Sequence, residues 1–108
     1  MRGLLFIGFL LLAPAISLAA DLSVYTVVIK DHVFEPAELE VPAGQKFKLI
    51  VDNQDPTPEE FESFQLNREK VVSGNRSVII FIGPLRQGIY KYFGDFHQKT
   101  AQGTIAAK

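Results

Sequence analysis

Two short segments place metal-ligand residue types on either side of a phenylalanine, Glu60-Phe61-Glu62 and Asp95-Phe96-His97. In an extended backbone, residues i and i+2 project from one face and residue i+1 from the other. We therefore expect each phenylalanine to enter the core, while the residues on either side of it project together as a pair of donors. The predicted metal ligands are Glu60, Glu62, Asp95 and His97.

Three carboxylates and one imidazole form a borderline-to-hard donor set. Such a set suits Mn(II), Fe(II) or Fe(III), Cu(II) or Zn(II), and it suits Cu(I) poorly. Without a cation, the neighbouring negative charges should raise some carboxylate pKa values. A bound ion would reverse that shift and release protons, so the site should weaken in acid.

Each segment taken alone has a simpler interpretation, a solvated acidic loop, because short motifs often match by chance. The spacing does not show that the two segments meet in space. Two further residues are weaker candidates. Glu59 extends the acidic run, and His32 stands in Asp31-His32-Val33, where a histidine is more often structural or exposed.

The composition excludes several classes of function. The 108 residues include no cysteine, which rules out thiol redox chemistry, a blue-copper thiolate and any disulfide partner. The formal net charge of −1 does not favour a nucleic-acid partner. No serine, lysine and histidine arrangement indicates a covalent nucleophile, and the two histidines lack the spacing of a zinc hydrolase.

The first twenty residues are typical of a secretory signal peptide. Arg2 precedes a short apolar run, and small residues lead to predicted cleavage after Ala19 or Ala20. An uncleaved anchor is the alternative, but spanning needs about 20 apolar residues and Pro14 interrupts the run. We expect residues 1–20 to be the signal peptide and residues 21–108 to form one domain.

The remaining sequence alternates at strand spacing. It favours seven or eight short strands in a sandwich or small barrel. We expect one helical turn near residues 66–70, a hairpin turn at Ser73-Gly74-Asn75, and a structural Tyr90 whose hydroxyl binds backbone. The predicted strands cover residues 25–30, 39–41, 47–52, 77–82, 89–93 and 103–108, with less regular ones at 60–66 and 69–72.

Several short motifs cover nearly the whole chain after residue 20. They are Phe34-Glu35-Pro36-Ala37-Glu38-Leu39, Val41-Pro42-Ala43-Gly44, Asn53-Gln54-Asp55, Glu59-Glu60-Phe61-Glu62-Ser63, Arg68-Glu69-Lys70, Gly83-Pro84-Leu85, Phe93-Gly94-Asp95-Phe96-His97 and Thr100-Ala101-Gln102-Gly103. Together these motifs resemble the cupredoxin-like proteins of bacterial periplasmic ferrous iron transport. Phe64 and Asp95 depart from the family pattern, which has histidine and glutamate there.

The resemblance implies an all-β, cupredoxin-like Greek-key sandwich. It also implies that residues 94–101 correspond to a copper loop, with Gly94 at the cysteine position, Ala101 near the methionine position and His97 retained. The first copper histidine would fall near Glu60 to Glu62, which would bring the two segments together. Without the thiolate, we expect no intense blue band.

By the same resemblance, the protein would work in the periplasm. It would bind Cu(II), with Mn(II) or iron as alternatives, and assist ferrous iron uptake by oxidising or delivering iron. Its partners would be a periplasmic high-affinity iron-binding protein and an inner-membrane iron permease. Whether it acts as a ferroxidase-type enzyme stays open. The alternatives are a metal-independent docking module and a copper chaperone, and the oligomeric state is open, with a dimer as one alternative.

Overall fold

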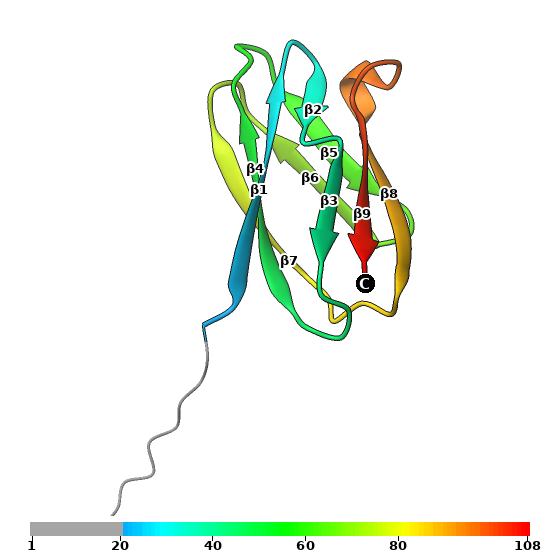
Figure 1. Cartoon of the computed structure of the whole chain (residues 1–108). Coiled ribbons are helices and arrows are strands. Elements are labelled where there is room, and N and C mark those ends of the chain that lie inside the picture. Colours follow the sequence, from blue (N-terminus) through cyan, green and yellow to red (C-terminus); the bar gives the residue numbers. More distant parts are fainter. Residues whose placement is uncertain (1–20) are drawn as a thin grey trace, which may run out of the picture.

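The computed structural model describes residues 21–108, which form two β-sheets packed face to face (Figure 1). The predicted β-sandwich is confirmed, with nine strands in residues 21–108. No helix among these residues is long and apolar enough to cross a membrane. The predicted signal peptide, residues 1–20, lies outside the described residues. The strands are β1 (Ser23–Lys30), β2 (Val33–Glu35), β3 (Glu38–Val41), β4 (Phe47–Asn53), β5 (Glu59–Ser63), β6 (Arg68–Val72), β7 (Ser77–Ile82), β8 (Gly88–Gly94) and β9 (Gln102–Ala107).

The two sheets differ in strand order. The first sheet runs β2-β1-β4-β7, and the second runs β3-β9-β8-β5-β6. The β1–β4 and β3–β9 pairs are parallel, and every other pair is antiparallel. The β1–β2 turn and the short 3₁₀ helix η1 (Asp95–His97) lie at one end of the sandwich, while β1 begins toward the other end (Figure 1).

Strict alternation along β4 shows why the sequence folds this way. Phe47, Leu49 and Val51 are buried, and the intervening residues are only partly buried, as expected for a strand with one face in the core. Each large apolar side chain buried in this way contributes about 1.5–3 kcal/mol.

An aromatic cluster joins the two sheets beneath the end that carries η1. Phe34 of β2 meets Tyr92 of β8 edge to face, with ring centroids 5.0 Å apart. Tyr92 stacks on Phe61 of β5 at 4.9 Å. All three rings are fully buried, so the strands that bear the candidate ligands rest on a rigid base.

Several local predictions need correction. The structure adds a strand, β2, which is too short for an alternation signal. Residues 68–70 belong to β6, and the helical turn forms at Asp95–His97 instead. The turn at Ser73-Gly74-Asn75 is not a hairpin, because β6 and β7 lie in different sheets. The Tyr90 prediction is confirmed, since its hydroxyl donates to the Arg86 carbonyl at 2.8 Å.

Arg68 links the free edges of the two sheets. Both β6 and β7 are edge strands. The Arg68 side chain crosses from β6, and its Nε and Nη2 atoms each donate to the Phe81 carbonyl of β7 at 3.1 Å. One backbone acceptor on the exposed edge of β7 is therefore occupied.

Candidate metal centre

His32 lies in a backbone conformation that few side chains adopt. Lys30 pairs with Val33, so Asp31 and His32 alone form the β1–β2 turn, with φ values of 52° and 59°. Two-residue hairpin turns with positive φ at both positions normally use asparagine and glycine. A histidine held here is therefore a sign of function as well as of turn formation.

The Asp55 carboxylate holds this turn in place. Its Oδ1 accepts the Asp31 amide at 2.7 Å and its Oδ2 accepts the His32 amide at 3.0 Å. The same Oδ2 lies 3.4 Å from His32 Nδ1. Burial alone would raise the pKa of Asp55, but these amide bonds and the neighbouring histidine outweigh it, so the pKa is lowered.

Asn53 anchors Asp55 in turn. The Asn53 side-chain oxygen accepts the Asp55 amide at 3.0 Å, and its amide nitrogen donates to the carbonyls of Thr57 and Val72 at 2.9 and 3.1 Å. Asn53 is 1% exposed and Asp55 is 6% exposed. This buried polar network fixes the loop between β4 and β5 against the His32 turn.

Glu59 points into the molecule from the first position of β5. It is 3% exposed. One carboxylate oxygen, Oε1, accepts the backbone amides of Phe96 and Glu60 at 2.8 and 3.0 Å. The other, Oε2, lies 2.6 Å from His97 Nδ1. A buried carboxylate with these partners is compensated and held in one orientation.

Gly94 makes room for this carboxylate. A Cβ atom at position 94 would lie 2.6 Å from Glu59 Cδ and 2.7 Å from the Ala101 Cβ. The volume that a side chain would occupy at position 94 is therefore filled by Glu59 and Ala101. This is the position at which the family resemblance expects the missing cysteine.

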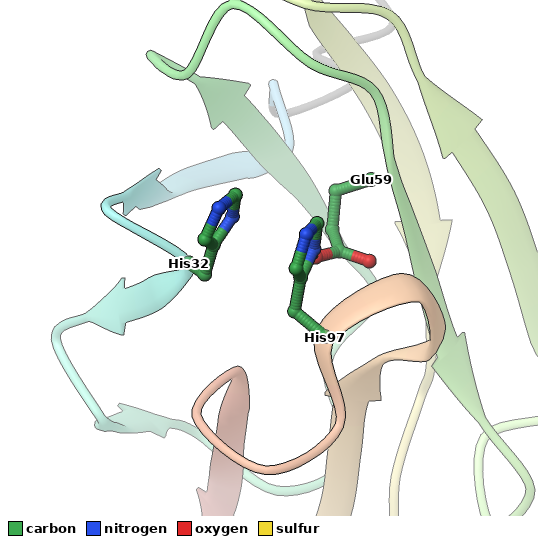
Figure 2. Close-up of side chains that lie close together, drawn as sticks. All are labelled: His32, Glu59 and His97. Atoms are coloured by element: carbon green, nitrogen blue, oxygen red, sulfur yellow. The ribbon is translucent and has the colours of Figure 1, made fainter.

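His97 completes the arrangement from η1. The His97 carbonyl accepts the Ala101 amide at 2.8 Å, which closes the loop between β8 and β9. The His97 ring stacks on His32 with centroids 3.5 Å apart and 11° between planes. His32, Glu59 and His97, called here the histidine group, offer ligand atoms that all lie within 4.8 Å of one another (Figure 2).

A second set of possible ligands, the outer acidic group, consists of Glu60, Glu62 and Asp95. Its ligand atoms also lie within 4.8 Å of one another, and its side chains are partly exposed. A hydrogen bond with Glu69, partial desolvation and nearby negative charges raise the pKa of Glu60 to about 7. Desolvation and the charges of Glu69 and Asp95 also raise the pKa of Glu62. The predicted upward shifts therefore occur on this face.

The single four-residue site predicted from the sequence is thus divided between two groups. Glu60, Glu62 and Asp95 come together, whereas His97 joins Glu59 and His32. The physical reason is η1: a 3₁₀ turn advances about 120° per residue, so Asp95 and His97 do not share a face as they would in a strand. Phe96 is 48% exposed, so its predicted place in the core is wrong, while Phe61 is fully buried as predicted.

Glu59 and His32 are the weaker candidates from the sequence, and the structure places both of them beside His97. Each has a signal in the sequence. Glu59 and Phe61 are two positions apart in β5, so their side chains point to the same face of the sheet. A buried Phe61 therefore predicts a buried Glu59, and a buried carboxylate needs a partner. His32 occupies a two-residue turn without the expected glycine.

A model of the cupredoxin-like domain family matches residues 3–107 of the chain. The chain belongs to the cupredoxin-like family. Among curated proteins, an uncharacterized protein of Rickettsia prowazekii (strain Madrid E) is 53% identical over 79 residues. That alignment covers 73% of this chain but 63% of the relative, so the chain spans less than two thirds of the relative's length.

Solved cupredoxins share the fold at low identity. Auracyanin A, a blue copper protein from Chloroflexus aurantiacus, aligns with a TM-score of 0.69 and 15% identity over 82% of this chain and 100% of its own. The metal-binding domain of the Cu(I)-exporting P-type ATPase of Streptococcus pneumoniae D39 aligns with a TM-score of 0.67 and 11% identity, over 83% of this chain and 91% of its own. Amicyanin from Paracoccus versutus aligns with a TM-score of 0.60 and 18% identity, over 82% of this chain and 83% of its own. These likenesses establish the fold and leave the ligands to be judged from this chain's residues.

The residues present fit a metal ion without a thiolate. Two imidazoles and one carboxylate are donors that suit Cu(II), Fe(II) or Zn(II). The side chains of His32 and His97 are 41% and 31% exposed, so an ion could enter from solvent, while Glu59 is buried beneath them.

Proposed function

We propose that this cupredoxin binds a divalent transition metal, with Cu(II) as the first candidate, at His32, Glu59 and His97. One observation carries the proposal. Three segments far apart in sequence, namely the β1–β2 turn, β5 and η1, bring two imidazoles and a buried carboxylate within 4.8 Å at one end of the sandwich. The Asp55 carboxylate, held by Asn53, fixes the turn that carries His32, and the Glu59 carboxylate fixes the His97 ring.

The donor chemistry narrows the choice of ion. Imidazole suits copper, zinc, iron and nickel, and a carboxylate adds hardness that disfavours Cu(I). Two histidines with one carboxylate are also the ligand set of many Fe(II) sites, which keeps iron as an alternative. Mn(II) would favour the outer acidic group, where all three donors are carboxylates.

The proposed physiological role is assistance in ferrous iron uptake in the periplasm. The support is the family resemblance of the motifs, together with a metal site that is open to solvent. A bound Cu(II) ion would supply a one-electron acceptor for Fe(II). The partly exposed His32 and His97 rings would let the cargo approach, and the proposed partners are a periplasmic iron-binding protein and an inner-membrane permease.

Calorimetric titration with Cu(II), Zn(II), Mn(II) and Fe(II) tests the site. His97→Ala, His32→Ala and Glu59→Gln should each weaken Cu(II) binding by more than about 100-fold, because loss of a ligand should exceed the 10–100-fold effect of outer-shell changes. The matched control is Glu60→Gln with Glu62→Gln, which should leave Cu(II) affinity nearly unchanged. If only the control pair lost affinity, the ion would belong to the outer acidic group.

The visible spectrum of the Cu(II)-loaded protein supplies an independent check. The chain has no cysteine, so no thiolate-to-copper charge-transfer band should appear. An intense blue band would require a different ligand set from the one proposed.

Iron chemistry needs its own measurement. Loss of Fe(II) in air should be faster with the copper-loaded protein than with the same copper free in solution, and His97→Ala should remove the difference. Equal rates would restrict the role to metal carriage and leave the binding site itself untouched.

A further inference from the structure

The outer face of the first sheet carries an ordered apolar patch. Strand register places Val24, Lys48 and Phe81 in one row across β1, β4 and β7, and Thr26, Ile50 and Ile79 in the next row. Val24, Ile79 and Phe81 are 52%, 54% and 48% exposed. These residues do not belong to the histidine group or to the outer acidic group, and the first-sheet patch is defined as Val24, Lys46, Lys48, Ile50, Ile79 and Phe81.

The patch is positively charged. The Nζ atoms of Lys46 and Lys48 lie 5.8 and 5.9 Å from the centre of the Phe81 ring. The first two rows contain no acidic side chain. Asp52 and Glu35 stand in the third row, and Ser77 and Gln54 donate to the Asp52 carboxylate at 2.8 and 3.1 Å. An apolar surface that also carries two lysines suits an interface that is anionic outside and apolar beneath.

We propose that the first-sheet patch docks this domain onto an anionic phospholipid surface. Charge complementarity supports this occupant. The ammonium groups of Lys46 and Lys48 lie beside the exposed Phe81 ring, so lipid phosphates can compensate the lysines while the ring enters the apolar layer.

The distribution of charge favours the outer face of the first sheet over that of the second sheet as the lipid-docking surface. The outer face of the second sheet carries Glu60, Glu62 and Glu69, which an anionic surface would repel. A second copy of the chain is a poorer occupant, because two patches face to face would bring four lysines together. Lipid phosphates would instead compensate the ammonium groups.

Docking in this way would orient the metal centre. β1 carries the patch near its start and leads to the His32 turn at the other end of the sandwich (Figure 1). The strand from Val24 to Lys30 spans about 20 Å. Because the patch lies on a sheet face, the strands would run along the lipid surface, and the histidine group would stay uncovered at the end of the sandwich. The docking proposal does not depend on whether a metal binds.

Co-sedimentation with vesicles tests the proposal, using the chain from Asp21, which contains all nine strands. The chain should sediment with vesicles that contain phosphatidylglycerol, should stay in solution with pure phosphatidylcholine, and should be released by salt. Lys46→Ala with Lys48→Ala should reduce the partition coefficient about 30-fold, since each lysine near an anionic surface contributes about 1 kcal/mol. Phe81→Ser, which keeps both lysines, should also weaken binding.

The matched control is Lys70→Ala with Lys91→Ala, which removes the same charge from exposed positions of the second sheet. It should bind like the parent, and circular dichroism should show all variants folded. Three results would overturn the proposal: no binding to phosphatidylglycerol vesicles, equal loss in the control pair, or ultracentrifugation showing a dimer that Phe81→Ser dissociates. The last result would assign the patch to a second copy of the chain.

Discussion

His32 and His97 stack with their ring centroids 3.5 Å apart and 11° between their planes. The first ring belongs to the turn that ends β1 in the first sheet, and the second belongs to the loop that leaves β8 in the second sheet. The stack therefore spans the two sheets, and Glu59 fixes one of its rings through Nδ1.

This stack should open when a metal binds. A ligating imidazole points a lone pair in its ring plane at an ion about 2.0 Å away. Two parallel rings 3.5 Å apart cannot both do so, and one must tilt. We expect titration with diamagnetic Zn(II) to remove the mutual ring-current shifts of His32 and His97 in proton NMR. Unchanged shifts at saturation would mean that at most one histidine ligates.

Asp55 should act on metal binding without contacting the ion. Asp55→Asn keeps the size of the side chain but weakens its bonds to the Asp31 and His32 amides. We expect Cu(II) affinity to fall about 10–100-fold, as for other outer-shell partners of histidine ligands. Asp52→Asn, which alters a partly buried carboxylate of the preceding strand β4, is the matched control for calorimetry. Equal effects of the two changes would argue against a positioning role.

Stability should fall as pH rises from about 4.5 to 7. Hydrogen bonding with Glu69 raises the pKa of Glu60 from 4.5 to about 7, so the folded chain holds a proton in this window that the unfolded chain has lost. This contribution to stability is complete below pH 4.5 and is lost above pH 7. The lowered pKa of Asp55 acts below 3.8, outside this window.

Urea unfolding at several pH values measures this dependence. Glu60→Gln should flatten it in the metal-free protein, leaving the smaller contribution of Glu62, whereas Glu35→Gln should preserve it. A slope of the opposite sign in the parent would contradict the shared proton between Glu60 and Glu69.

Two tyrosines of β8 should respond oppositely to loss of the hydroxyl. The Tyr92 hydroxyl is buried and has no hydrogen-bond partner among residues 21–108, and burial raises its pKa. Tyr92→Phe should leave the free energy of unfolding unchanged or raise it by about 1 kcal/mol. Tyr90→Phe loses the bond to the Arg86 carbonyl and should lower it by about 1 kcal/mol. Thermal and urea unfolding of both variants make the comparison, and clear destabilisation by Tyr92→Phe would indicate an unseen partner for its hydroxyl.

Most of the fold was predictable because burial alternates along the strands. The Phe47 to Asp52 alternation and the buried Phe61 follow directly from period two. The three-residue strand β2 was not predicted, because three residues are too few to show an alternation of buried and exposed positions. The sheet to which β7 belongs could not be read from the turn before it, because a turn of given composition joins strands within a sheet or between sheets.

The candidate site was less predictable, for a local reason. The two acidic segments and His97 were predicted as ligands from the sequence, with an extended backbone expected through Asp95-Phe96-His97. There, the bonds from the Phe96 amide and the His97 ring to Glu59 accompany a tight turn. Those partners lie far apart in sequence, so no local pattern could place His97 beside Glu59 and His32.

The Arg68 bond to Phe81 has a consequence for solubility. The β7 sequence Ser77–Ile82 is rich in β-branched and aromatic residues, and its free edge could recruit a strand from another molecule. Because the Arg68 guanidinium already donates to the Phe81 carbonyl, an incoming strand would find this acceptor on the β7 edge occupied. Arg68→Ala should therefore make the β7 edge more prone to aggregation, at a place away from the histidine group.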